Sequence, residues 1–180
     1  FLSSERLYTP MHAREFARYI DHTLLRPDAT DKDVLRLCDE AAGYGFASAC
    51  VASCWAGAAR ERLEGTGVKV CCVVGFPFGS AAPYAKASEA WAAVDSGADE
   101  LDVVMNFGYL RSGMAEEIKG ELSAVVAAAR GATVKVIIET CYLTDEEKVL
   151  AARLVRDSGA AFVKTSTGYG PMGAVAKDVR

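Results

Sequence analysis

Short apolar runs alternate with longer amphipathic segments along most of this 180-residue chain. Six runs rich in β-branched residues predict strands at residues 20–25, 47–52, 68–76, 100–106, 133–139 and 162–166. Capping residues and helical periodicity predict helices at about 9–19, 30–45, 54–64, 84–96, 115–129 and 144–159. Regular alternation of strand and helix predicts parallel β-α-β units in a single domain.

Two architectures fit this order, a doubly wound sheet and a (β/α)₈ TIM barrel, and side-chain alternation separates them. Successive side chains of a strand point to opposite faces, so Leu101 and Val103 share one face and Asp102 lies on the other. The same alternation places further polar residues on the face of Asp102, namely Asp21, Thr23, Lys135, Glu139 and Lys164. The central strands of a doubly wound sheet are apolar on both faces, whereas the lumen of a barrel turns polar toward its catalytic rim. We therefore predict a barrel with a polar lumen.

The chain supplies six of the eight units of such a barrel, for which about 250 residues are typical. It starts at Phe1, and its last segment, "AVAKDVR", resembles the opening turn of a helix. We expect residues 1–180 to form one barrel domain whose strands seven and eight are missing. The first and sixth strands would then have unpaired edges, which favours association.

Composition narrows the possible partners. The net charge of −4 and the absence of a basic patch argue against nucleic acid, and no apolar run is long enough for a membrane span. The charged N-terminal segment is unlike a secretory signal, so we expect a cytoplasmic protein. The six cysteines are expected to be mainly buried free thiols, and with only two histidines we expect no metal site.

Lys164 is the candidate for covalent chemistry, because it lies in the middle of an apolar strand. In a partly desolvated cavity near a second cation such as Lys135, its pKa is expected to fall and its neutral amine to become nucleophilic. The amine would attack a carbonyl to form an iminium, and Asp102 on the same face would transfer protons. A structural ion pair between these groups is the alternative interpretation.

Five motifs in order carry a more specific signal: "IDHTLLRPDAT", "GFPFG", "GADELDVVMN", "VKVIIETCYLTDEEK" and "GAAFVKTSTGYG". Together they resemble the deoxyribose-phosphate aldolase family of class I aldolases. The resemblance implies Lys164 as the Schiff-base lysine and Asp102 in proton transfer. It also implies reversible cleavage of 2-deoxy-D-ribose 5-phosphate to D-glyceraldehyde 3-phosphate and acetaldehyde, without metal or organic cofactor. Homodimers are usual in the family.

The resemblance also places a second catalytic lysine and most phosphate-binding loops beyond Arg180, which leaves Thr167 and Gly168 to contribute to substrate binding. Lys135 is expected to support the field at Lys164 or to form a structural pair. Asp21, Thr23 and Cys50 are candidates for substrate contact, and a structural or packing role is the alternative for each. Two other functions stay open: another Schiff-base aldolase or transaldolase, and a non-catalytic incomplete barrel.

Overall fold

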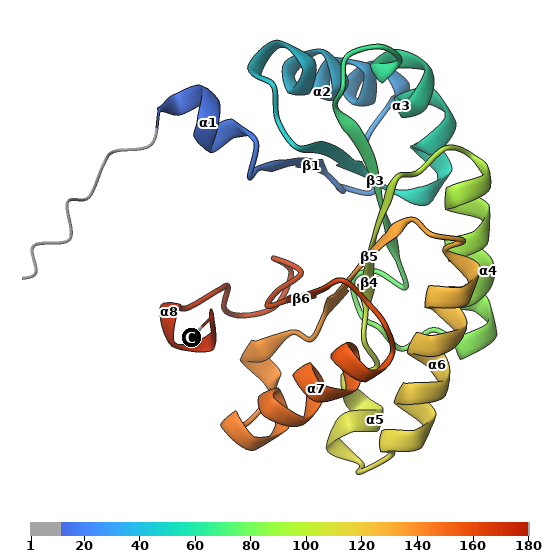
Figure 1. Cartoon of the computed structure of the whole chain (residues 1–180), viewed down its shortest axis with the longest axis vertical. Helices are drawn as coiled ribbons and strands as arrows, with labels where there is room; N and C mark the ends of the chain where they lie inside the picture. The colour runs from blue at the N-terminus through green and yellow to red at the C-terminus, as the bar shows by residue number, and fades with distance from the viewer. Residues whose placement is uncertain (1–11, 180) are drawn as a thin grey trace, which may run out of the picture.

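The computed structural model describes residues 12–179, and its central feature is one curled sheet of six parallel strands (Figure 1). The strands are β1 (Asp21–Leu24), β2 (Ser48–Val51), β3 (Lys69–Val74), β4 (Glu100–Val104), β5 (Thr133–Ile137) and β6 (Phe162–Lys164). Each strand pairs with the strand that precedes it in the sequence, so the order is β1-β2-β3-β4-β5-β6. A doubly wound sheet reverses its strand order in the middle. The sequential order therefore confirms the predicted barrel architecture, of which this sheet is a part.

Helices connect successive strands and cover the convex face of the sheet, except for one helix before β1 and one after β6, which lie on its open side (Figure 1). Their bounds are α1 (Ala13–Ala17), α2 (Asp31–Tyr44), α3 (Ala56–Leu63), α4 (Pro83–Asp95), α5 (Phe107–Arg111), α6 (Ala115–Ala128), α7 (Asp145–Asp157) and α8 (Ala176–Val179), with 3₁₀ turns η1 (Ser53–Trp55) and η2 (Thr140–Tyr142). The helices expected between strands are confirmed, and the last segment forms α8. The short helix α5 was not predicted. The predicted helix start at Thr9 and Pro10 lies outside the described residues.

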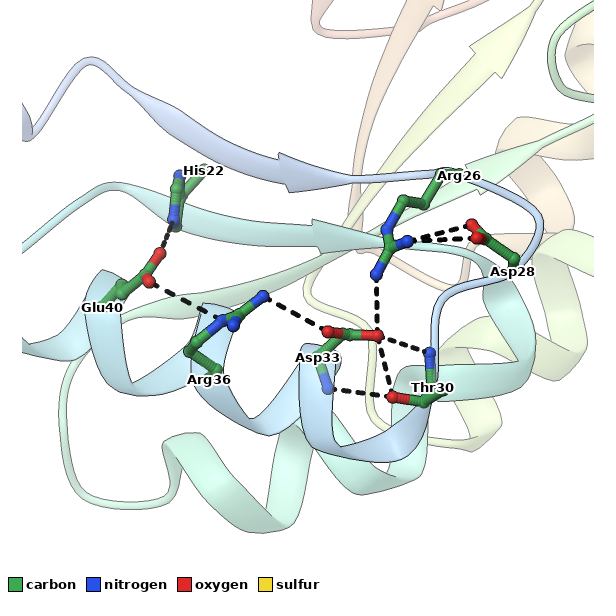
Figure 2. A network of polar contacts seen from close by, with 7 residues as sticks. All are labelled: His22, Arg26, Asp28, Thr30, Asp33, Arg36 and Glu40. Atoms are coloured by element: carbon green, nitrogen blue, oxygen red, sulfur yellow. Dashed lines mark hydrogen bonds and ion pairs between the residues drawn. The ribbon is translucent and has the colours of Figure 1, made fainter.

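Capping boxes form at the starts of two helices. The side chain of Thr30 accepts the backbone N–H of Asp33, and the Asp33 carboxylate accepts the N–H of Thr30, at the start of α2 (Figure 2). Thr144 and Glu147 form the same reciprocal pair at the start of α7. Each box satisfies two N–H groups that a helix leaves without partners in its first turn.

The capping box of α2 belongs to an exposed network of charged residues that ties the loop after β1 to the helix (Figure 2). Arg26 donates to Asp33 at 2.8 Å and to Asp28 at 3.1 Å. Farther along α2, Glu40 pairs with His22 of β1 at 2.7 Å. His22 therefore faces the helices, as the alternation of strand residues predicts.

The apolar core lies between the sheet and the helices. Outward side chains of the central strands, such as Val51, Leu101 and Val136, have no exposed surface and pack against buried faces of the helices. A smaller apolar cluster of Cys50, Cys71 and Val73 lies on the inner face of the sheet. This separation of an apolar outer face from a mixed inner face is the one predicted from strand alternation.

The cysteines and the helices bear on two further expectations. All six thiols are free and four of them are buried, as expected, whereas Cys54 is exposed and Cys141 is half-buried. Among the helices formed by residues 12–179, none combines the length and the apolar character needed to cross a bilayer.

Candidate active site

Lys135 is the centre of a charged network on the inner face of the sheet. Its Nζ lies 2.7 Å from a carboxylate oxygen of Asp21, 2.9 Å from one of Glu100 and 3.2 Å from one of Asp102. Strand register explains part of this arrangement, because Asp102 and Lys135 are directly paired across β4 and β5. Three carboxylates from two other strands therefore surround one ammonium group. Lys135 is 8% exposed, so this network is largely buried.

Lys164 joins the network from the next strand. Its Nζ donates to Oδ2 of Asp102, whose other oxygen faces Lys135. Asp102 is almost completely buried, whereas the Lys164 side chain keeps 35% of its surface exposed. Lys164 lines a cavity of about 560 Å³ on the inner face of the sheet. A ligand in this cavity could contact the Lys164 ammonium group, which is hydrogen-bonded to Asp102.

The expectation that the pKa of Lys164 is lowered is wrong. Burial alone lowers the pKa, but the charge of Asp102 and its hydrogen bond raise it by more, so the pKa lies above its usual value. Burial likewise lowers the pKa of Lys135, and its contacts with Cys71, Asp102, Asp21 and Glu100 overcome that effect and raise it. The expectation counted the repulsion between the two lysines and omitted the direct contact of each with Asp102. Both side chains are ammonium ions at rest.

Three other predicted residues line the same cavity, namely Asp21, Thr23 and Cys50. The Asp21 carboxylate accepts from the Ser48 hydroxyl at 2.7 Å and from Lys135; burial opposes ionisation, but these contacts hold the pKa of Asp21 below its usual value. The Thr23 hydroxyl donates to the backbone carbonyl of Asp21 at 2.9 Å. The structure thus brings these residues together with Lys164.

Cys50, Cys71 and Asp102 form a small cluster at the wall of the cavity, which Cys50 and Asp102 line. The sulfur atoms and a carboxylate oxygen lie within 4.8 Å of one another, a spacing that a metal ion could span. Hydrogen bonding with Cys50 and burial raise the pKa of Cys71 well above its usual value. The Lys135 ammonium lies 3.7 Å from the Cys71 sulfur and already supplies positive charge there.

The segment after β6 contains Thr167 and Gly168, and both line the cavity. Thr167 differs from expectation, because its backbone N–H and its hydroxyl both donate to the carboxylate of Glu139. These two donors are therefore already used within the protein. Gly168 has a φ of +85°, a conformation that favours glycine.

Two charged residues of the inner face, Glu100 and Lys69, were not predicted from the sequence. Glu100 binds Lys135 from one side and Lys69 of β3 from the other, at 2.6 Å. Glu100 precedes Asp102 by two positions, so the strand period that placed Asp102 in the lumen also predicts Glu100 there.

A second buried ion pair lies on the outer side of the sheet, between α4 and α6. Lys86 Nζ is 2.7 Å from a carboxylate oxygen of Glu121 and donates to the backbone carbonyl of Val104 at 2.8 Å. Neither side chain has exposed surface. Burial lowers the pKa of Lys86 and raises that of Glu121, and their mutual contact opposes both shifts. This pair fastens the carboxyl end of β4 to two helices.

Comparisons with known proteins agree on one kind of enzyme. The sequence model of a family described as DeoC/LacD family aldolase matches residues 16–179. A deoxyribose-phosphate aldolase of Methanocella arvoryzae is 61% identical over 172 residues, which cover 94% of this chain and 77% of that protein. The protein of the same name from Clostridium kluyveri is 49% identical over 170 residues, covering 94% of this chain and 78% of its own length.

Solved structures give the same result. A putative deoxyribose-phosphate aldolase from Coccidioides immitis superposes with a TM-score of 0.92 at 40% identity, covering 96% of this chain and 68% of that one. A deoxyribose phosphate aldolase from Aeropyrum pernix, described as a unique tetramer, has a TM-score of 0.81 at 39% identity, covering 88% of this chain and 67% of that one.

Proposed function

The chain belongs to the DeoC/LacD family of aldolases, and from this premise we propose that it cleaves 2-deoxy-D-ribose 5-phosphate reversibly to D-glyceraldehyde 3-phosphate and acetaldehyde. One observation carries the assignment of residues: Lys164 faces a cavity with its ammonium hydrogen-bonded to the buried carboxylate of Asp102. Schiff-base chemistry requires at least a primary amine and a proton acceptor in contact with it.

The first step is the removal of a proton from the Lys164 ammonium, and Asp102 is the acceptor in contact with it. The free amine adds to the C1 carbonyl of the open-chain sugar to give a carbinolamine, which loses water to form an iminium. The bond between C2 and C3 then breaks, the C3 hydroxyl proton passes to a base, and the electron pair moves into the iminium to give an enamine. Glyceraldehyde 3-phosphate leaves with C3 as its aldehyde.

The second half of the reaction returns the enzyme to its starting state. Protonation of the enamine carbon gives the iminium of acetaldehyde, and water hydrolyses this to release acetaldehyde and the Lys164 amine. The iminium is the electron sink, so the reaction as proposed requires no metal or organic cofactor. Lys135 has a supporting role in this proposal, because its contacts with Asp21, Glu100 and Asp102 hold the Asp102 carboxylate in place.

The proposed partners follow from the reaction. They are a phosphorylated sugar and small aldehydes, and we place the reaction in the cytoplasm. Self-association, as a homodimer or a higher oligomer, is proposed from the family and from the tetramer described for the Aeropyrum pernix protein.

Reductive trapping tests the assignment directly. Incubation with acetaldehyde and borohydride, followed by peptide mass spectrometry, should place a two-carbon adduct on Lys164. Lys164→Met should abolish the adduct and reduce sugar-phosphate cleavage by about 10³-fold or more, because the covalent route is lost. Lys177→Met, which removes an exposed lysine, is the matched control and should keep both. An adduct on another lysine, or none in the unmodified protein, contradicts the proposal.

A further inference from the structure

Glu139 has an unusual backbone conformation directly after β5. Its φ is +51° and its ψ +65°, which is the left-handed region that residues with a Cβ atom rarely adopt. Among residues 12–179, Arg130 is the other residue with a side chain that has a positive φ. Arg130 is exposed, whereas Glu139 has 1% of its surface exposed. A strained backbone that carries a buried carboxylate calls for a functional explanation.

The carboxylate of Glu139 holds the segment that follows Lys164. Its oxygens accept the backbone N–H of Thr167 at 3.2 and 3.3 Å, and one of them also accepts the Thr167 hydroxyl. The Thr167 oxygen in turn accepts the N–H of Tyr169 at 3.0 Å. One buried side chain therefore fixes the conformation of residues 167–169.

Backbone contacts extend the same attachment. The N–H of Ile138 donates to the carbonyl of Lys164 at 3.0 Å, and the N–H of Thr140 donates to that of Thr165 at 2.8 Å. A Cβ atom at Gly170 would lie 2.8 Å from the Cys141 sulfur, so only glycine lets the loop pack this closely. Glu139 is thus the polar centre of a contact that starts at Lys164 and ends at Gly170.

The far side of this loop also has a fixed position. The Tyr169 hydroxyl donates to the carbonyl of Leu25 after β1 at 3.1 Å, and its ring meets Phe76 edge to face with centroids 5.3 Å apart. Thr167 and Gly168 between these two anchors line the cavity of Lys164. Within the described residues, no hydrogen bond uses the N–H of Gly168.

We infer that Glu139 is a positioning residue, which fixes the loop of residues 165–170 and so supports the substrate-binding role that the family resemblance implies for Gly168. This inference rests on the proposed function. Glu139 takes both donors of Thr167, and its negative charge disfavours a phosphate at that residue. Gly168 has an N–H that no residue of the described range 12–179 accepts, it has no side chain, and it lines the cavity. These three features together suit the polar end of a sugar phosphate.

The test compares substrate affinity with Schiff-base formation. Glu139→Gln keeps the shape of the side chain but leaves one acceptor oxygen for two donors, and its NH₂ group opposes the Thr167 N–H. The KM for 2-deoxy-D-ribose 5-phosphate should rise about tenfold or more, as expected for a lost charge-assisted hydrogen bond. The kcat should change less, and borohydride trapping of Lys164 by acetaldehyde should match the unmodified protein.

Two further variants separate positioning from folding. Arg130→Gly removes the other positive-φ side chain, which is exposed, and should leave kcat, KM and trapping unchanged. Thr167→Val removes the hydroxyl donor but keeps the N–H, and should raise KM in the same direction by a smaller factor. It replaces Glu139→Gln as the decisive variant if that protein does not fold.

The outcomes are distinguishable. An unchanged KM in Glu139→Gln overturns the inference while the proposed function stands. Parallel losses in KM, kcat and trapping, together with a lowered melting temperature, also overturn it, because they indicate a merely structural role. Failure to trap Lys164 in the unmodified protein overturns the proposed function, whatever the variants do.

Discussion

Two sets of buried charges lie on opposite sides of strand β4. On the inner side, Asp102 contacts the ammonium groups of Lys135 and Lys164, and two further carboxylates contact Lys135. On the outer side, Lys86 has one carboxylate partner and one backbone carbonyl. The pKa values of the inner lysines are raised, whereas that of Lys86 is lowered.

The difference shows that burial alone does not set the direction of a lysine pKa. Burial disfavours all three ammonium groups, and the arrangement of negative charge around each lysine decides the outcome. The inner set also borders a cavity, so a ligand can reach Lys164, whereas the outer pair is closed on every side. The inner set is therefore the one that suits the proposed chemistry, whereas the outer pair fastens β4 to its helices.

Removal of the shared carboxylate should have the largest effect. Asp102→Asn should reduce sugar-phosphate cleavage by about 10²- to 10⁴-fold, because the proposed proton acceptor at Lys164 is lost. It should also lower the pKa of Lys164, since the group that raises it is gone, so the rate of acetaldehyde trapping should reach half its maximum at a lower pH. Trapping rates measured across pH in the unmodified protein and the variant test this.

Glu100→Gln is the matched control, because Glu100 contacts Lys135 but forms no bond with Lys164. Its trapping profile should stay near that of the unmodified protein. A profile of Asp102→Asn that does not move, or that moves to higher pH, would show that another group sets the pKa of Lys164.

Removal of one partner of the outer ion pair should lower the stability of the fold more than it changes the rate of catalysis. Lys86→Met leaves the Glu121 carboxylate buried without its partner and should lower the free energy of unfolding by about 3–5 kcal/mol. The double variant Lys86→Met with Glu121→Leu should regain most of this loss, because an apolar pair of similar volume replaces both charges. Urea unfolding measures both, and a double variant no more stable than the single one would refute the explanation.

The smallest effect is the pH dependence of stability, and the two regions should give it opposite signs. The raised pKa of Lys164 stabilises the fold below the unfolded-state value of about 10.4, and this contribution disappears as pH rises through the folded-state pKa. The lowered pKa of Lys86 means that the unfolded chain binds the proton more strongly, so its contribution becomes more favourable as pH rises through its folded-state pKa toward that same value.

Urea unfolding between roughly pH 8 and pH 11 should therefore show a smaller loss of stability for Lys164→Met than for the unmodified protein. Equal losses in the two proteins would mean that Lys164 makes no such contribution.

Strand alternation was sufficient to predict which residues face the lumen. It placed Asp21, Asp102, Lys135 and Lys164 on one face, because a period of two is a property of every strand. It also predicts Glu100, which was overlooked. The sequential strand order of a barrel could be predicted for a similar reason, because residues 100–106 carry polar groups that a doubly wound sheet would not bury.

Features that depend on contacts distant in the sequence could not be predicted. The sign of the Lys164 pKa shift depends on a hydrogen bond to Asp102, which is 62 positions away. Lys86 and Glu121 lie on different helices, and neither sequence neighbourhood indicates that both are buried. The left-handed backbone of Glu139 has no local signal, because the loop that it holds comes from the next strand.

The sequential strand order has a consequence for how the protein forms. Each strand after the first finds its hydrogen-bonding partner in the preceding β-α unit, so the sheet can grow in the order of synthesis, one crossover at a time. The bond between Asp21 and Lys135 is different, because it spans 114 positions and joins β1 to β5. The backbone can therefore be assembled stepwise, whereas this link in the charge network waits until the fifth strand has docked.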